Sequence, residues 1–130
     1  MKKEFKGVIP PIVTPFKDTA NQEIDEQKLR AHIDFLVENG VHGIFICSGT
    51  GEYFNYTEPD FRESAQITVD EVNGRVPVLG GAGSPGTQNA VRLARILKDV
   101  GVDAVIAVGP YYNRVIYEEG VYLHYKTISD

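Results

Sequence analysis

The sequence predicts an α/β fold built on a parallel β-sheet, and two observations lead to this prediction. Short apolar runs rich in Val and Ile alternate with longer segments whose apolar residues recur at helical spacing. The apolar runs do not alternate with polar residues, which indicates strands buried on both faces, as in a parallel sheet. Regular alternation of strand and helix also implies right-handed crossovers between parallel strands.

Four apolar runs are the predicted strands. The first, residues 8–13, contains two prolines, each of which removes a backbone donor and weakens the run as a strand. Residues 43–47 and 76–80 form the second and third runs, and residues 104–108 form the strongest. Each run is followed by a loop and a longer segment, so we count four βα units.

The intervening segments predict four helices. Residues 24–39 carry apolar side chains at helical spacing and stop at an Asn-Gly pair. The second helix begins at Thr57, a predicted N-cap with a proline in the first turn behind it, and continues to residue 73. Residues 87–100 form the third, and the fourth begins near Tyr117 and is still running at Asp130.

Two architectures accommodate four βα units in 130 residues. A doubly wound sheet would be complete in this length, whereas a (β/α)₈ TIM barrel needs about 250 residues. The last helical segment shows no stop signal before Asp130, which favours the barrel. We therefore expect residues 1–130 to be the N-terminal half of a single (β/α)₈ barrel domain.

Composition narrows the class of protein. The chain has 13 Lys and Arg against 18 Asp and Glu, a net charge of −5, which argues against binding nucleic acid or anionic membranes by bulk charge. A single cysteine, Cys47, excludes an internal disulfide framework. Neither a signal peptide nor a membrane-spanning run is visible. These features predict a cytoplasmic protein without membrane or nucleic-acid partners.

The loop after the second strand is a candidate anion site. Gly49 and Gly51 flank Thr50, so backbone N–H groups can turn toward a bound carboxylate or phosphate, and the hydroxyls of Ser48 and Thr50 add donors. A tight glycine-rich turn whose hydroxyls are satisfied internally explains the same residues equally well. The pattern alone leaves both interpretations open.

The next two loops are less specific. Residues 80–86 could cradle a phosphate, but close packing of helix against strand is the favoured explanation of their glycines. In the fourth loop, residues 109–114, a phenol of Tyr111 or Tyr112 could relay protons or bind a substrate oxygen. Packing or a subunit interface is the favoured explanation for these tyrosines.

The remaining candidates are weaker. We expect His32 and His124 to lie on the surface, and the three histidines have no metal-ligand spacing, so no metal site is predicted. Cys47 is expected to be a small core residue rather than a nucleophile. Glu52 could serve as a base, but it is expected to anchor its loop or to cap the next helix.

Four segments in order carry a family resemblance: residues 7–16, 48–52, 74–78 and 110–114. Together they resemble the N-terminal half of the dihydrodipicolinate synthase / N-acetylneuraminate lyase family. The resemblance implies a (β/α)₈ barrel and class I aldolase chemistry, in which a lysine forms a Schiff base with pyruvate or a related 2-keto acid. No dissociable cofactor is implied.

The resemblance also assigns roles to residues. It implies that Thr50 binds the pyruvate carboxylate, helped by backbone amides around Gly49 and Gly51. Tyr112 matches a tyrosine that crosses a subunit interface into the neighbour's proton relay. A homo-oligomer, dimer or tetramer, is therefore expected, with Tyr111 and Tyr112 at the interface.

Two departures qualify the resemblance. The synthase has a threonine where this chain has Gly49, which points toward aldolases or dehydratases of 2-keto-3-deoxy sugar acids, although Ser48 could supply a neighbouring hydroxyl. The loop with Tyr111 and Tyr112 points back toward the synthase. None of the seven lysines ends a predicted core strand, so the Schiff-base lysine is expected beyond Asp130 and the chain alone is expected to be inactive.

A rival hypothesis from a different class is a non-enzymatic, doubly wound module that binds a phosphorylated ligand at residues 81–83. Sequential strand order favours the half-barrel, and a reversal of order with helices on both faces favours the module.

Overall fold

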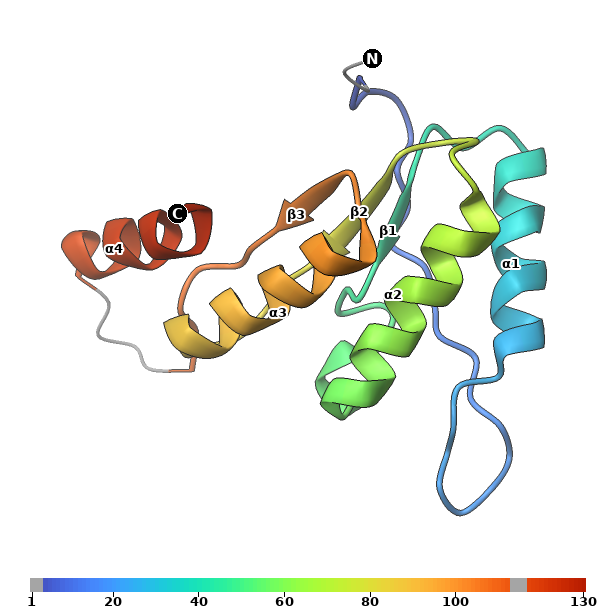
Figure 1. Cartoon of the computed structure of the whole chain (residues 1–130), viewed down its shortest axis with the longest axis horizontal. Helices are drawn as coiled ribbons and strands as arrows, with labels where there is room; N and C mark the ends of the chain where they lie inside the picture. Colours follow the sequence, from blue (N-terminus) through green and yellow to red (C-terminus); the bar gives the residue numbers. More distant parts are fainter. Residues whose placement is uncertain (1–3, 113–116) are drawn as a thin grey trace.

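A computed structural model describes residues 4–112 and 117–130 and shows an α/β arrangement (Figure 1). Helices and strands alternate along the chain as the sequence predicts. In chain order the elements are α1 (Glu26–Glu38), β1 (Ile44–Ile46), the 3₁₀ turn η1 (Tyr53–Asn55), α2 (Glu58–Val72), β2 (Val78–Gly81), α3 (Thr87–Val100), β3 (Ala104–Ile106) and α4 (Glu118–Ser129).

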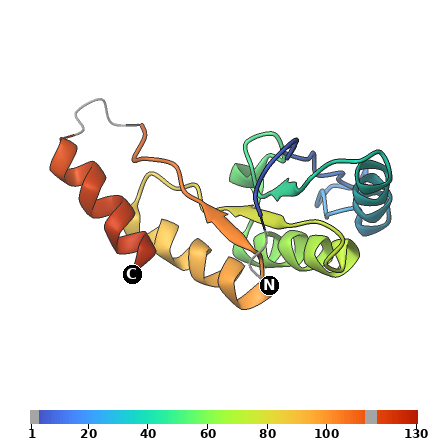
Figure 2. The same cartoon turned by 90° about the horizontal axis from the view of Figure 1, so that it is seen from above.

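The three strands form one parallel sheet in the sequential order β1-β2-β3. Ile44 pairs with Val78, and Leu79 pairs with Ala104, so each crossover contains one helix. The helices α2 and α3 run side by side along one face of this sheet (Figure 2). Strand order does not reverse in the described chain, which contradicts the rival doubly wound module and fits a fragment of a (β/α)₈ barrel.

The first apolar run lies beside β1 but forms only an isolated parallel bridge, between Pro11 and Phe45. The Ile12 N–H donates to the Phe45 carbonyl, and the Phe45 N–H donates to the Pro10 carbonyl, both at 3.0 Å. Two adjacent prolines have no N–H to extend the ladder. The prediction of a strand here is therefore wrong in extent, although the run has the position of the first unit.

The predicted helices are confirmed, with one boundary corrected. Ile24 was expected inside α1, but it forms an antiparallel bridge with Phe16, and the helix begins after Asp25, which caps it. At α2 the hydroxyl of Thr57 accepts from the Asp60 N–H, and the Asp60 carboxylate accepts from the Thr57 N–H. This reciprocal capping box fixes the start of the helix.

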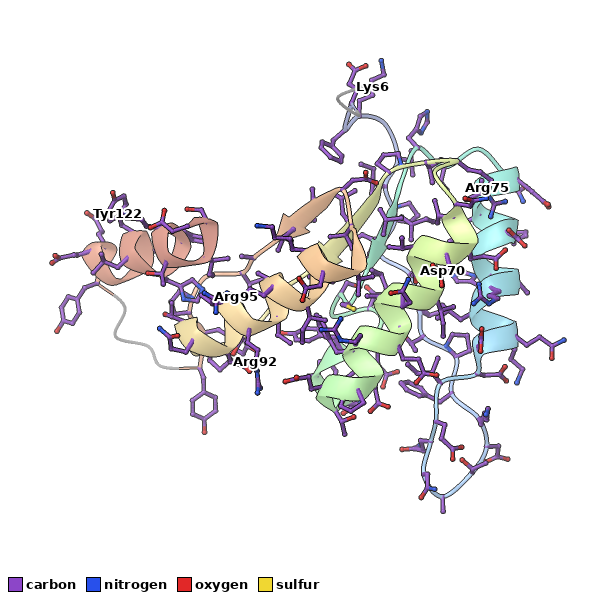
Figure 3. The ribbon with its side chains drawn as sticks, in the orientation of Figure 1. Lys6, Asp70, Arg75, Arg92, Arg95 and Tyr122 are labelled. Carbon is purple, nitrogen blue, oxygen red and sulfur yellow. The ribbon has the colours of Figure 1, made fainter. Side chains whose placement is uncertain are left out.

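One hydrophobic core lies between the sheet and its helices. Its fully buried members include Leu29 and Ile33 of α1, Phe61 of α2, and Leu97 of α3. Arg75 links α1 to α2, because its guanidinium donates to the Asp34 carboxylate of α1 at 2.6 Å and to the Glu71 carbonyl of α2 at 2.7 Å (Figure 3). None of the described helices is both long and apolar enough to cross a membrane.

The last strand differs from its neighbours. All four residues of β2 are buried, as predicted, but β3 is half-buried and its Val105 is 38% exposed. The prediction that residues 104–108 are buried on both faces is therefore wrong. Within the described chain β3 pairs with β2 alone, so its other edge has no strand partner there.

Candidate active site

The loops at the carboxyl ends of the strands meet around residues 48–53. Gly51 lies against the first loop: a side chain built on it would come within 2.9 Å of the Ile12 carbonyl oxygen and 3.2 Å of the Thr14 hydroxyl. Tyr53 reaches the last loop, where its hydroxyl lies 3.1 Å from that of Tyr111. This is the edge at which parallel α/β folds bind ligands.

Ser48 closes the loop rather than projecting from it. Its carbonyl accepts from the N–H groups of Gly51 and Tyr53 at 3.0 and 3.4 Å, and its hydroxyl accepts from the Gly51 N–H at 3.3 Å. The residue is only 4% exposed. Ser48 and Gly51 therefore support the loop, which is the role given to them by the tight-turn interpretation.

Gly49 and Thr50 form the exposed crest of the same loop. In the part of the chain that the structure describes, no hydrogen bond engages their backbone N–H groups or the Thr50 hydroxyl. An anion site at this loop would use these three donors, since a carboxylate accepts several N–H and O–H bonds at once. Ser48 and Gly51 thus follow the tight-turn interpretation, while the anion site at Gly49 and Thr50 stays a prediction.

The space around the two glycines of the loop, Gly49 and Gly51, differs. A side chain at Gly51 would meet backbone, so glycine is required there. Nothing lies within 4 Å of a Cβ built on Gly49. The absence of a threonine at position 49 is therefore not imposed by packing.

A line of hydroxyls that the sequence did not reveal lies behind the loop. The Thr14 hydroxyl makes a short hydrogen bond with that of Tyr56, which lies 3.3 Å from the Ser64 hydroxyl. Burial raises the pKa of Tyr56, against the opposing effect of its two hydroxyl partners. No local sequence pattern marks Tyr56, because Thr14 lies 42 residues before it and Ser64 lies 8 residues after it.

Cys47, next to the loop, is fully buried, and burial raises the pKa of its thiol to about 12. A thiol that stays protonated is a poor nucleophile, so the prediction of a core cysteine is confirmed. Glu52 accepts a hydrogen bond from the Asn55 amide at 3.0 Å and makes no side-chain cap on η1. It anchors the loop, as expected.

Neighbours leave no room for a side chain at three glycines of residues 80–86. A Cβ on Gly80 would lie 2.5 Å from a methyl carbon of Leu97 in α3, one on Gly81 would lie 2.3 Å from the Cys47 carbonyl oxygen, and one on Gly83 would lie 2.5 Å from the Tyr53 hydroxyl. Close packing of helix against strand is thus confirmed at Gly80, whereas nothing lies within 4 Å of a Cβ on Gly86.

Tyr111 and Tyr112 are both exposed but differ in their contacts. The Tyr111 hydroxyl lies beside that of Tyr53, whose pKa is raised to about 12 by burial and secondly by this hydrogen bond. Tyr112 is 93% exposed, with a φ of +82° that non-glycine residues rarely adopt. The structure does not bring it into contact with Thr50. Asn113 and Arg114 lie outside the described residues.

The histidine prediction is half wrong. His32 is partly buried on α1, and His124 is not a surface residue but is 2% exposed. The five described lysines lie in the N-terminal segment, the first loop or helices. Across residues 4–112 and 117–130, no three His, Cys, Asp or Glu side chains cluster so as to hold a metal ion.

Comparison with known proteins gives consistent relatives. The model of the dihydrodipicolinate synthetase family matches residues 4–130. A 4-hydroxy-tetrahydrodipicolinate synthase of Methanopyrus kandleri is 42% identical over 127 residues, which are 98% of this chain and 42% of the relative. A protein of the same name from Syntrophus aciditrophicus is 46% identical over 97% of this chain and 42% of its own length. The chain spans less than half the length of these relatives.

Solved structures agree with these relatives. A crystal structure of a dihydrodipicolinate synthase superposes with a TM-score of 0.90 at 42% identity, over 96% of this chain and 42% of that protein. A prophage protein of the dihydrodipicolinic acid synthase family from E. coli K12, solved in complex with pyruvate, gives a TM-score of 0.89 at 30% identity, over 96% and 41%.

Proposed function

The chain belongs to the dihydrodipicolinate synthetase family, and from this premise we propose that it forms the N-terminal half of a (β/α)₈-barrel lyase that makes or breaks a C–C bond of a 2-keto acid. Residues 1–130 would supply the carboxylate-binding loop. A lysine beyond Asp130 would form the Schiff base, whose iminium accepts the electrons of the reacting bond.

The observation that carries this proposal is the exposed crest at Gly49 and Thr50. Its two N–H groups and one hydroxyl match the acceptors of a carboxylate, and the buried Ser48 and Gly51 hold the crest rigid from below. Preorganised donors of this kind bind an anion without reorganising. The carboxylate of pyruvate, or the pyruvate portion of a longer 2-keto acid, is the proposed ligand.

Tyr112 is the proposed catalytic contribution of this chain to a neighbour. A phenol that is 93% exposed and held in an uncommon backbone conformation suits a role outside its own subunit. Together with Tyr111, it would lie at the interface of a homodimer or homotetramer and join the partner's proton relay. We propose that the assembly works in the cytoplasm, without a metal or a dissociable cofactor.

Two proposals differ in the part of the substrate that extends beyond the pyruvate portion. The names of the relatives and the tyrosine pair support a synthase-like condensation. Gly49, where the side chain is absent without a packing reason, supports an aldolase or dehydratase of a 2-keto-3-deoxy sugar acid. Gly49→Thr restores the synthase-like residue in open space, so it should shift preference toward the synthase acceptor if the sugar-acid proposal is correct.

To test the proposal, this chain is fused to the part of the Methanopyrus kandleri relative that follows the segment it matches. We call the product the joined protein. We expect borohydride to trap a pyruvate adduct on the joined protein and none on the 130-residue chain. Thr50→Ala should weaken pyruvate binding to the joined protein about tenfold, since a hydrogen bond to a charged group is lost. Thr19→Ala, an exposed loop threonine, is the matched control and should change nothing.

Two outcomes would contradict the proposal. A reduced adduct on any lysine of the 130-residue chain would show that the Schiff-base lysine lies within it. Equal pyruvate affinity in the joined protein and its Thr50→Ala variant would remove the crest from the binding site.

A further inference from the structure

His124 is a buried histidine to which neither the fold nor the proposed chemistry gives a role. It is the one buried residue of α4, whose Leu123 and tyrosines are exposed, with Tyr122 at 63% (Figure 3). Its Nδ1 lies 2.9 Å from the Thr87 hydroxyl, and its Nε2 lies 3.1 Å from the Val108 carbonyl oxygen. Both ring nitrogens therefore have partners.

The two partners determine the form of the ring. A carbonyl oxygen only accepts, so Nε2 must carry the proton that it donates to Val108. In the neutral ring Nδ1 is then unprotonated and accepts from the Thr87 hydroxyl, which can donate. The geometry thus fixes one tautomer of neutral His124, and this tautomer satisfies every polar atom in the contact.

The contact joins three parts of the chain that are distant in sequence. Thr87 is the first residue of α3, Val108 follows β3, and His124 lies in the middle of α4. Val108 leads directly into Tyr111, whose hydroxyl meets that of Tyr53 at the end of the 48–53 loop. A hydrogen bond at Val108 therefore constrains the segment that carries both tyrosines.

We propose that His124 is a positioning residue, whose Nε2–H bond to Val108 holds the segment after β3, and with it Tyr111, against Tyr53 of the loop that carries Thr50. The link to catalysis rests on the proposed function, whereas the structural clamp does not. His124 is the one buried residue of α4, so losing its bond to Val108 weakens the packing of α4 on the segment after β3, where the Tyr125 hydroxyl beside Gly109 makes a second contact.

The clamp is tested first on the 130-residue chain by nuclear magnetic resonance. The ¹⁵N shifts of the His124 ring should show protonated Nε2 and unprotonated Nδ1. Observation of the opposite tautomer would overturn the proposal. This measurement needs no variant, so it decides the point even if substitutions at position 124 prevent folding.

Two amide variants then separate the two hydrogen bonds. In His124→Gln the longer side chain places its amide where Nε2 was, so it keeps a donor for the Val108 carbonyl. In His124→Asn the shorter side chain places its amide where Nδ1 was, so it keeps only a partner for Thr87. The proximity signal between the rings of Tyr53 and Tyr111 should persist in His124→Gln and fall at least severalfold in His124→Asn. Equal behaviour of the two variants would overturn the proposal.

The matched control is His32→Asn, on a partly buried histidine of α1, which should leave the tyrosine signals unchanged. In the joined protein, His124→Asn should lower kcat roughly tenfold or more with KM for pyruvate little changed, since misplaced catalytic groups cost rate. An equal loss in His124→Gln would contradict the role given to Val108. If the joined protein traps no pyruvate, the proposed function fails, and the tautomer and ring signals still decide the clamp.

Discussion

β2 and β3 are adjacent strands with similarly apolar sequences, yet they differ in burial. Every residue of β2 is buried, whereas Val105 at the centre of β3 is 38% exposed. β2 pairs on both sides and is covered by α2 and α3, while β3 pairs on one side only. Neighbours, rather than composition, decide how deeply a strand is buried.

The loops that follow the strands also differ in how tightly they pack. The loop after β1 is held by its own hydrogen bonds and pressed against the first loop, so only its crest at Gly49 and Thr50 is available to a ligand. The segment after β3 leaves Tyr112 almost fully exposed. The proposed carboxylate site lies in the packed region, and the proposed subunit contact at Tyr112 lies in the open one.

The largest effect should come from truncating one apolar side chain in each region. Leu97→Ala removes a fully buried side chain that packs beside β2, and should lower the free energy of unfolding by about 3 kcal/mol. Val105→Ala should cost less than about 1 kcal/mol, because much of that side chain already contacts water. Urea unfolding measures the free energy of unfolding of both variants, and an equal loss in the two would contradict the difference between β2 and β3.

Adding a methyl group tests the same contrast in the other direction. Gly81→Ala would push a Cβ to within 2.3 Å of a backbone carbonyl oxygen, and should destabilise the protein by about 2 kcal/mol. Gly120→Ala on α4 meets nothing within 4 Å and should stabilise the helix by about 0.5 kcal/mol. Thermal unfolding of the two variants should therefore shift in opposite directions.

The packed region should also respond to alkaline pH. Burial raises the pKa of Cys47 from 9.0 to about 12, so the folded state favours the protonated thiol. The free energy of unfolding should be highest below pH 9 and fall as the pH rises toward 12, on the order of 1 kcal/mol per pH unit. Cys47→Ala should remove this part of the slope; an unchanged slope would argue against a buried thiol.

The smallest effects concern helix ends. Thr57→Ala removes the capping box of α2 and should cost about 1 kcal/mol. The N-cap of α4 is Tyr117, which makes no side-chain capping bond, so Tyr117→Ser should stabilise by about 0.5 kcal/mol. Urea titration of the pair shows whether the open region can be stabilised locally; Thr50→Ala, whose hydroxyl has no hydrogen-bond partner among the described residues, is the neutral control.

Local signals predicted much of the fold. The bounds of α3 and the cap at Thr57 were predicted as the structure has them, because caps and apolar spacing act within a few residues. Ile24 was wrongly included in α1 because its partner, Phe16, lies across a loop. The exposure of Val105 depends on the elements that pack around β3, which residues 104–108 themselves do not encode.

The candidate site likewise contains one part that the sequence predicted and another that it did not. The crest at Thr50 could be predicted, because two flanking glycines and a hydroxyl are consecutive in sequence. The partner of Tyr111 could not, since Tyr53 is remote along the chain and only the sheet brings the two hydroxyls together. His124 was misplaced for the same reason: its burial depends on Thr87 and Val108, which belong to other elements.

The sequential order of the strands has a kinetic consequence. Each pairing joins segments that are separated by a whole helix, so the chain between two strands must close before they can pair. β3 pairs with β2 alone and is half-buried, so fewer contacts hold it than hold β2. The amides of β3 should therefore exchange with solvent before those of β2.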